Sequence, residues 1–393
     1  MKKFYVISIL ITFLSSVLLL NACKKESAIS PEPTGSKIAL GNLDLDNNLK
    51  AAVAGTKVSL GKLLFLDENL SNPGGESCGS CHSSAVSFTD PFHRIVSPGA
   101  VKGLFGNRNA PMASYTMFNP PFHYSVTDST YEGGLFDDGR VNTLEEQAMK
   151  PFVNPLEMNN PELGTVVSKV HKASYYPLYQ KIYGDIKDVN TAINNIVDAI
   201  ATYERSPELN PFTSKFDYYL KGEAKLTDQE RLGLNLFNDT LRAKCVNCHL
   251  TTPDAASGKI LFTDFTYNSD GVPKNPLNPY YNIPRTFNPL GRDYRDLGLG
   301  AIVGDPTLNG NFRVSSLRNV AITAPYFHNG VYTTLEQVVH FYNVRDVPGS
   351  GIAPPEVPEN IDTEETGNQH LTLKEEAAIV AFLKTLTDGY KKQ

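Results

Sequence analysis

Apolar positions along the chain repeat with helical spacing in several short segments. One segment carries an apolar stripe made of Ile193, Ile196, Val197 and Ile200. This spacing predicts an amphipathic helix, because residues three and four apart lie on the same helix face. The pattern Gly-x-x-Leu-Phe-x-Asp occurs at 61–67 and again at 233–239, in two further apolar segments. We therefore expect a helix of the same kind at both places.

Capping pairs indicate where other helices begin. In three places a threonine precedes a glutamate by three residues, which is the spacing of a capping box. The pairs are Thr143 and Glu146, Thr227 and Glu230, and Thr372 and Glu375. The segments 268–311 and 344–369 are rich in Pro, Gly and Asn, which favours ordered loops. The expected fold class is mainly α, with long ordered loops and little strand.

The composition is typical of a soluble globular protein. The chain has 393 residues, of which 41% are hydrophobic and 20% are charged, and this length usually makes two domains. The formal net charge is −6, whereas proteins that bind nucleic acids usually carry a basic face. We therefore expect no nucleic-acid partner.

The N-terminus has the pattern of an export signal. In residues 1–22 a basic start is followed by an apolar run, which two serines interrupt, and then by small residues. The four residues that end at Cys23 read LNAC and resemble the bacterial lipobox. This predicts cleavage before Cys23 and acylation of its thiol, although an ordinary signal peptide with an incidental cysteine is the alternative.

The segment that follows Cys23 predicts a flexible tether over residues 23–45. With an acylated Cys23, the mature protein would be exported and held at a membrane by its N-terminal lipid. A lysine, and not an aspartate, follows Cys23, which is compatible with delivery to the outer membrane. The expected location is therefore the outer membrane, with the protein facing the periplasm or the cell surface.

The other four cysteines all lie in the motif C-x-x-C-H, which reads CGSCH at 78–82 and CVNCH at 245–249. Exported proteins normally pair their cysteines as disulfides, but a thioredoxin-like C-x-x-C needs no histidine after it. A zinc site built from both pairs would span a much longer insert than zinc ribbons have. C-x-x-C-H is instead the attachment signature of c-type haem.

The motif predicts two covalently bound haem c groups. Each haem would be held by two thioether bonds, and the histidine would be the proximal iron ligand. The predicted attachment residues are Cys78 and Cys81 for one haem and Cys245 and Cys248 for the other. The predicted iron ligands are His82 and His249. Because the helix pattern also occurs twice, we expect two related haem modules in tandem, at 46–220 and 221–393.

Several sequence blocks together resemble one protein family. In chain order they are GKLLFLDENLS, NRNAP, DDGRVNTLEEQAMKPFVNPLEM, KCVNCH and FRVSSLRNVAITAPYFHNGVYTTLEQVVHFYN. They are similar to the bacterial di-haem cytochrome c peroxidases, which include the MauG type, and the resemblance extends from about 55 to 388. It implies that 46–220 is a peroxidatic cytochrome c-like domain and that 221–393 is an electron-transfer cytochrome c-like domain.

The resemblance implies a catalytic pair at the first haem. In the family a glutamine and a glutamate ten residues later line the open face of the iron, and here these positions are Gln147 and Glu157. Glu157 would act as the general acid and base that moves a proton between the peroxide oxygens, and Gln147 would orient the peroxide. The alternative is a solvated helix residue at Gln147 and an ordinary loop carboxylate at Glu157.

The resemblance also implies a second ligand for the other haem. Peroxidases of the family use a methionine fourteen residues after the histidine of PYFHDG, and the same count from His328 gives Tyr342. The MauG type has a tyrosine there, so we expect a His249/Tyr342 haem of lower potential than a His/Met haem. The alternative is that Tyr342 only packs in an apolar helix face. His340 lies off that face and is expected in solvent.

The chain departs from the family between the haems. The family commonly has a tryptophan in FWDGR, whereas this chain reads LFDDGR, with Asp137 at that position, and contains no tryptophan. Because Phe136 is a poor redox relay, electrons would cross directly between the haem edges or through a tyrosine. This departure argues against the tryptophan-mediated hopping of the MauG type.

The family further implies a calcium ion between the haems. The matching donors are the Asn109 side chain and the backbone carbonyls of Thr323 and Pro325, and oxygen donors of this kind suit Ca²⁺. A loop asparagine that only forms a turn is the alternative. Classical members also close the resting iron with a loop histidine. Here the nearby histidine, His93, has a different spacing, so we expect an open His82 haem.

Three functions agree with these features. The first is a peroxidase that reduces hydrogen peroxide to water with electrons from a small exported redox protein, such as a cytochrome c. The second is a MauG-like oxidase that uses peroxide to modify a protein or a small molecule; Tyr342 favours it and Asp137 opposes it. The third is a non-catalytic di-haem electron carrier, which would have no use for Gln147 and Glu157. The family often forms dimers, so a homodimer is among the expected states.

Overall fold

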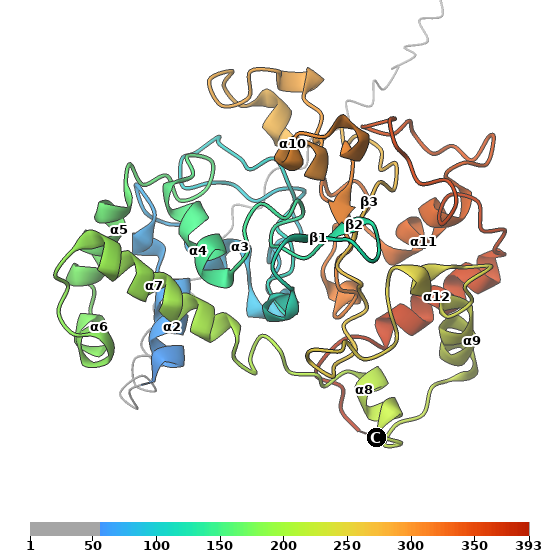
Figure 1. Ribbon diagram of the computed structural model, residues 1–393, viewed down its shortest axis with the longest axis horizontal. Helices are drawn as coiled ribbons and strands as arrows, with labels where there is room; N and C mark the ends of the chain where they lie inside the picture. Colours follow the sequence, from blue (N-terminus) through green and yellow to red (C-terminus); the bar gives the residue numbers. More distant parts are fainter. Residues whose placement is uncertain (1–55, 393) are drawn as a thin grey trace, which may run out of the picture. The chain divides into compact units, whose positions relative to one another are not determined.

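The computed structural model describes residues 56–392, which fall in one compact unit. The described helices are α2 (Lys57–Leu66), α3 (Cys78–Cys81), α4 (Leu144–Val153), α5 (Leu163–Lys172), α6 (Tyr176–Tyr183), α7 (Val189–Glu204), α8 (Lys215–Leu220), α9 (Asp228–Phe237), α10 (Leu299–Val303), α11 (Leu335–Val344) and α12 (Leu373–Lys384) (Figure 1). Short 3-10 helices and two short antiparallel pairs of strands complete the described regular structure. The expected mainly α fold class with little strand is confirmed.

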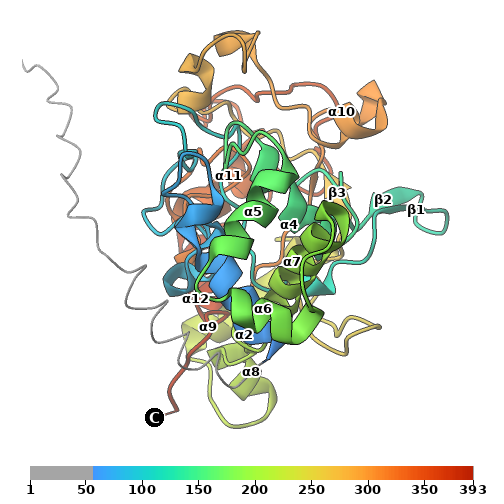
Figure 2. The same cartoon turned by 90° about the vertical axis from the view of Figure 1, so that its left-hand side faces the viewer.

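The strands are short and lie at the edges of long loops. Strand β1 (His123–Ser125) pairs with β2 (Thr130–Glu132), with Tyr124 opposite Tyr131. This hairpin projects from the rest of the fold in Figure 2. Strand β3 (Tyr267–Asn268) pairs with β4 (Phe312–Arg313). No described helix is both long enough and apolar enough to cross a bilayer.

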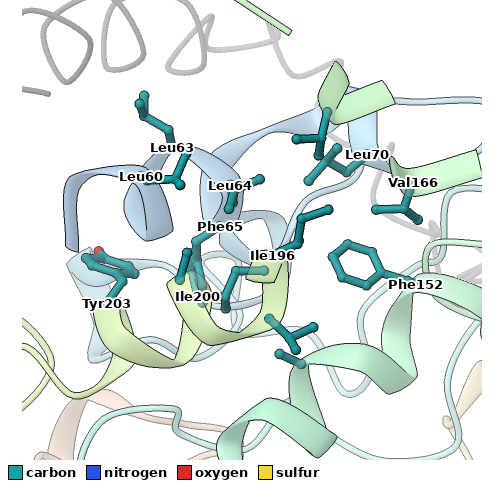
Figure 3. Close-up of a cluster of buried hydrophobic side chains, with 14 of the residues drawn as sticks. Leu60, Leu63, Leu64, Phe65, Leu70, Phe152, Val166, Ile196, Ile200 and Tyr203 are labelled. Atoms are coloured by element: carbon teal, nitrogen blue, oxygen red, sulfur yellow. The ribbon is translucent and has the colours of Figure 1, made fainter. Parts of the chain in front are cut away.

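Helix α2 crosses α7 at very short range. Gly61 permits this contact, because a Cβ at that position would lie only 1.9 Å from the backbone oxygen of Ala199. The apolar stripe predicted on α7 is buried against α2 and α4, as Figure 3 shows for Ile196 and Ile200. The ring of Phe65 meets that of Tyr203 edge to face at 5.4 Å.

Helix α9 crosses α12 in the same way. A Cβ on Gly233 would lie 1.9 Å from the backbone oxygen of Ala378. The ring of Phe237 meets that of Phe382 edge to face at 5.1 Å. The helices predicted from the repeated Gly-x-x-Leu-Phe-x-Asp pattern are thus both present, and each forms half of a close helix crossing.

The predicted caps largely form. Thr227 with Glu230, and Thr372 with Glu375, make reciprocal capping boxes on α9 and α12. At α4 the Thr143 side chain accepts from the backbone N–H of Glu146, but the Glu146 carboxylate accepts from the N–H of Asn142 instead of Thr143. Thr143 therefore caps α4, but the second hydrogen bond of the expected capping box is made to Asn142 and not to Thr143.

The loop predictions agree with the structure, whereas the domain boundary stays a prediction. The segment 344–369 has no helix or strand after α11 ends, and 268–311 contains, after the end of β3, only turns, three short 3-10 helices and α10. One buried apolar cluster draws its residues from 60–209 and another from 216–386. The signal peptide, the tether and Cys23 lie outside the described residues.

Candidate functional site

The first cavity contains the first C-x-x-C-H motif. Cys78 and Cys81 lie on α3, His82 ends that helix, and all three line the cavity. Gln147, on α4, and Glu157, in the turn after α4, line the same cavity. The structure therefore brings together the residues predicted to bind the haem and the two predicted to act on peroxide, although these segments are far apart in sequence.

The orientation of His82 suits an iron ligand. Its Nδ1 lies 2.9 Å from the backbone oxygen of Phe88, which can only accept a hydrogen bond. Nδ1 therefore carries the proton, and the lone pair of Nε2 is left for a metal. Burial lowers the pKa of His82, so the ring stays neutral, as iron ligation requires. Phe88 presents this oxygen from a left-handed backbone conformation, with φ of 60°.

Glu157 is positioned by the backbone around it. The backbone N–H of Glu157 donates to the backbone oxygen of Asn154 at 3.1 Å. The backbone oxygen of Glu157 accepts from the N–H of Ala100 at 2.7 Å. Burial raises the pKa of the Glu157 carboxyl, and the nearby Arg140 guanidinium opposes that rise. Arg140 itself is held 2.5 Å from the Asp138 carboxylate. A carboxyl with a raised pKa can both take and return a proton near neutral pH.

The second cavity contains the second C-x-x-C-H motif. Cys245, Cys248 and His249 line it together with Tyr342 of α11. The Nδ1 of His249 lies 2.9 Å from the backbone oxygen of Phe262, so Nε2 is again left for a metal. Burial lowers the pKa of His249 to about 4.

Tyr342 faces the second cavity and does more than pack. Its hydroxyl donates a 3.0 Å hydrogen bond to Asp270, which also lines the cavity. Burial raises the pKa of the Asp270 carboxyl to about 6 and that of the Tyr342 phenol well above its usual value. His340 lies outside the lining of both cavities, with its Nδ1 3.0 Å from the Glu376 carboxylate.

A shared wall separates the two cavities. The segment 109–112, Asp137 and Arg313 line both of them. The N–H of Arg313 donates to the backbone oxygen of Asp137 at 2.8 Å. Phe136 lines the first cavity, where the Arg140 guanidinium lies 3.7 Å from its ring centroid. The position that carries tryptophan in the family thus lies in this wall as Asp137.

The residues predicted to bind calcium gather at the second cavity. Asn109, Thr323 and Pro325 all line it. The side-chain amide of Asn109 donates to the backbone oxygens of Arg94 and Ile95, at 3.0 and 3.1 Å. These bonds use its N–H groups, so the amide oxygen is not needed for them. The calcium site stays a prediction.

His93 lies apart from both cavities. Its ring is exposed and its Nδ1 lies 2.8 Å from the backbone oxygen of Ala324, and it belongs to the lining of neither cavity. This position agrees with the expectation that His93 is not an iron ligand.

The chemistry of the lining fits two haem groups. The thiols of the two C-x-x-C pairs form no disulfide. Burial raises the pKa of Cys81, Cys245 and Cys248 to about 12. Within residues 56–392, no group of three or more His, Cys, Asp or Glu side chains is placed to hold a metal ion. Each cavity thus offers a pair of thiols for thioether bonds beside a neutral imidazole.

Some lining residues were not identified from the sequence. Arg140, Glu204 and Asp270 were missed. Arg140 ends the LFDDGR block but was given no role there, and no motif marks Glu204 or Asp270. The carbonyls that orient the histidines do have a signal. Phe-Thr-Asp follows each C-x-x-C-H motif, at 88–90 and 262–264, and the first residue of each repeat is the acceptor.

Comparisons with known proteins agree with this arrangement. A family model described as di-haem cytochrome c peroxidase matches residues 55–225. The methylamine utilization protein MauG of Paracoccus denitrificans is 35% identical over 351 residues, which cover 84% of this chain and 88% of that protein. The cytochrome c551 peroxidase of Nitrosomonas europaea is 32% identical over 331 residues, which cover 84% of this chain and 79% of that protein.

A solved structure shows the same fold. The diheme peroxidase BthA from Burkholderia thailandensis has a TM-score of 0.75 and 32% identity, covering 85% of this chain and 86% of that chain. A MauG-like protein associated with microbial copper homeostasis has a TM-score of 0.65 and 29% identity, covering 86% of this chain and 92% of that chain. The resemblance seen in the sequence is confirmed, and this chain belongs to the di-haem cytochrome c peroxidase family.

Proposed function

We propose that this protein reduces hydrogen peroxide to water with electrons from a small exported redox protein, such as a cytochrome c. The observation that carries the proposal is the shared cavity of His82, Gln147 and Glu157. The overall reaction joins one peroxide, two electrons and two protons to give two molecules of water. An electron carrier alone would need no acid–base pair at this place.

Haem held by Cys78, Cys81 and His82 would supply an iron that binds peroxide and takes up electrons. The Glu157 carboxylate would accept the proton from the oxygen nearer the iron and return it to the leaving oxygen, so that the O–O bond breaks heterolytically. The Gln147 side chain would orient the peroxide by hydrogen bonding. The covalent attachment of haem at both motifs is part of this proposal.

The residues of the second cavity would hold an electron-storing site. Together with His249, the Tyr342 oxygen would serve as a ligand of the haem iron held there. Asp270 accepts the phenolic hydrogen bond and would take the proton when the phenol becomes a ligand. An oxygen donor stabilises ferric iron relative to a thioether, which suits a site that passes electrons to the first cavity.

The test of the proposal is Glu157→Gln, with Glu162→Gln as the matched control, because Glu162 is an exposed glutamate nearby. We expect Glu157→Gln to slow peroxide turnover with reduced cytochrome c by roughly a hundredfold or more, with both haem spectra almost unchanged. Glu162→Gln should keep wild-type turnover. Full activity in Glu157→Gln would reject the role of Glu157.

A MauG-like oxidase is the second candidate. Tyr342 at the second cavity favours it, as does the identity of 35% with MauG, whereas Asp137 in the shared wall opposes it. Adding peroxide to the resting protein, with and without reduced cytochrome c, separates the candidates. Turnover of the cytochrome supports the peroxidase; a long-lived oxidised spectrum that cytochrome does not discharge supports the oxidase.

We also propose that the protein is exported and anchored by lipid at Cys23. A second proposal is that it binds calcium through Asn109, Thr323 and Pro325. Mass spectrometry of the N-terminal peptide tests the first, because acylation adds a fixed mass to Cys23. Calcium content before and after Asn109→Ala tests the second. A homodimer stays among the expected states and is tested by light scattering.

A further inference from the structure

Glu204 is a buried carboxyl at the first cavity that the proposed chemistry does not use. It is the last residue of α7, its exposed fraction is 5%, and it lines the cavity. Its Oε2 atom is buried and has no hydrogen-bond partner among the described residues. Burying a polar group without a partner costs free energy, so this position calls for a functional explanation.

The second helix crossing shows which kind of side chain is compatible with the position of Glu204. Gly61 meets Ala199 and Tyr203 as Gly233 meets Ala378 and Phe382, so the same spacing of four residues aligns α7 with α12. Five residues after Ala199 comes Glu204, and five after Ala378 comes Leu383, which lines the second cavity. The helix crossing therefore accepts an apolar side chain there, and the carboxyl is specific to the cavity that contains Glu157.

The surroundings keep the Glu204 carboxyl neutral near pH 7. Burial raises its pKa to about 8, and Arg205 opposes the rise only in part, because it is paired with Glu145 at 2.6 Å. The charged or titratable groups around it are Arg205, Glu145, Tyr203, the Cys78 thiol and, across the cavity, Arg140 and Glu157. A haem bound at Cys78 would lie in the same low-dielectric space.

We propose that Glu204 is a redox-linked proton-binding group of the first cavity, which binds a proton from solvent when the haem there accepts an electron. The electron comes from the donor redox protein and reduces the iron; the proton binds the carboxylate, and no covalent bond to substrate forms. The physical cause is Coulombic, because added negative charge nearby disfavours the ionised carboxylate. The inference rests on the haem site of the proposed function, but not on its reaction with peroxide.

The linkage has a defined sign. Reduction raises the proton affinity of Glu204, so protonation favours the reduced haem. Because Glu204 is already protonated below its pKa of about 8, the reduction potential of the first haem should be constant at lower pH and should fall as pH rises above that value. Above that pH, such a linkage would let one proton arrive with the electron that reduces this haem and would keep the net charge of the buried site constant.

The test is a redox titration of the haem-loaded protein from pH 6 to 9, followed by EPR to separate the two ferric haems, with no peroxide present. In the wild type we expect the potential of the first haem to be constant at the lower end of this range and to fall with pH above the Glu204 pKa of about 8. In Glu204→Gln it should be nearly independent of pH throughout. The matched control is Glu145→Gln, which removes a more exposed glutamate beside Arg205. It should keep the pH dependence but move it to lower pH, because Arg205 is then free to lower the pKa of Glu204.

Two results would overturn the inference. One is a wild-type potential that does not change over this pH range, which requires no variant to fold. The other is a pH dependence that survives in both Glu204→Gln and Glu204→Leu, where the leucine copies Leu383. The redox titration uses no peroxide. If the wild-type protein did not turn over peroxide, the proposed function would be rejected, but the pH dependence of the first haem's potential could still be measured and would still test Glu204.

Discussion

The two helix crossings have nearly the same geometry but surround different chemistry. In α2 and α7, as in α9 and α12, a glycine packs on a backbone oxygen and two aromatic rings meet edge to face. Each crossing lies beside a cavity with a buried C-x-x-C-H motif. The first cavity then adds Glu157 and Glu204, whereas the second adds Tyr342 with its hydrogen-bond partner Asp270. One duplicated scaffold therefore holds two cofactors, and a few side chains decide what each does.

The largest loss of stability is expected when a buried ion pair is removed from 216–386, the range of the second apolar cluster. Arg318 is 2% exposed and its guanidinium lies 2.9 Å from Asp217. Arg318→Met should lower the free energy of unfolding by about 3–5 kcal/mol, because Asp217 is left as an unpaired buried charge. Chemical denaturation measures the loss. The control is Arg231→Met in an exposed pair, which should cost at most about 1 kcal/mol.

The comparison is sharpened by adding one methyl group to each crossing. Gly61→Ala and Gly233→Ala each place a Cβ 1.9 Å from a backbone oxygen, so each should cost about 1–3 kcal/mol or somewhat more, by overpacking. The two losses should be similar, as measured by thermal or chemical unfolding. Gly164→Ala, where the nearest atom is 3.6 Å away, is the control. A large difference between the first two variants would contradict the equivalence of the crossings.

The pH dependence of peroxide turnover should arise from Glu157 in the first cavity and not from residues of the second cavity. Because burial raises the pKa of Glu157 and the carboxylate form must accept the proton, turnover should fall as pH drops through that raised pKa. The fall should approach about tenfold per pH unit and should begin above the pH at which an ordinary glutamate titrates. Steady-state rates measure this limb, and Glu157→Gln should abolish it. A limb that persists in this variant assigns the titration to another group.

Local signals made most of the fold predictable. The stripe on α7 and the caps of α9 and α12 depend on residues three to five apart, so the sequence alone carries them. The residues predicted to attach haem followed from the short motif C-x-x-C-H, in which each cysteine and the histidine has a defined chemical role. Glu157 and Tyr342 required the family resemblance, because a loop carboxylate and a helix tyrosine have no local mark of function.

The residues that were missed depend on distant contacts. Glu204 ends a helix, and its sequence position predicts a solvated helix end, yet the side chain is buried in the lining of the first cavity. Asp270 lies in a loop, and only the fold brings it to Tyr342, which is 72 residues away along the chain. Burial of such groups is decided by which segments meet, and a single sequence does not record that.

The shared wall has a consequence for how the two centres behave. Because 109–112, Asp137 and Arg313 line both cavities, the same residues border both centres. Charge placed on one side of this shared wall is therefore felt on the other, because a protein interior screens charge less than water does. The two centres should fill with electrons as a coupled pair, in which the first electron makes the second harder to add, so that the midpoint of each centre depends on the charge of the other.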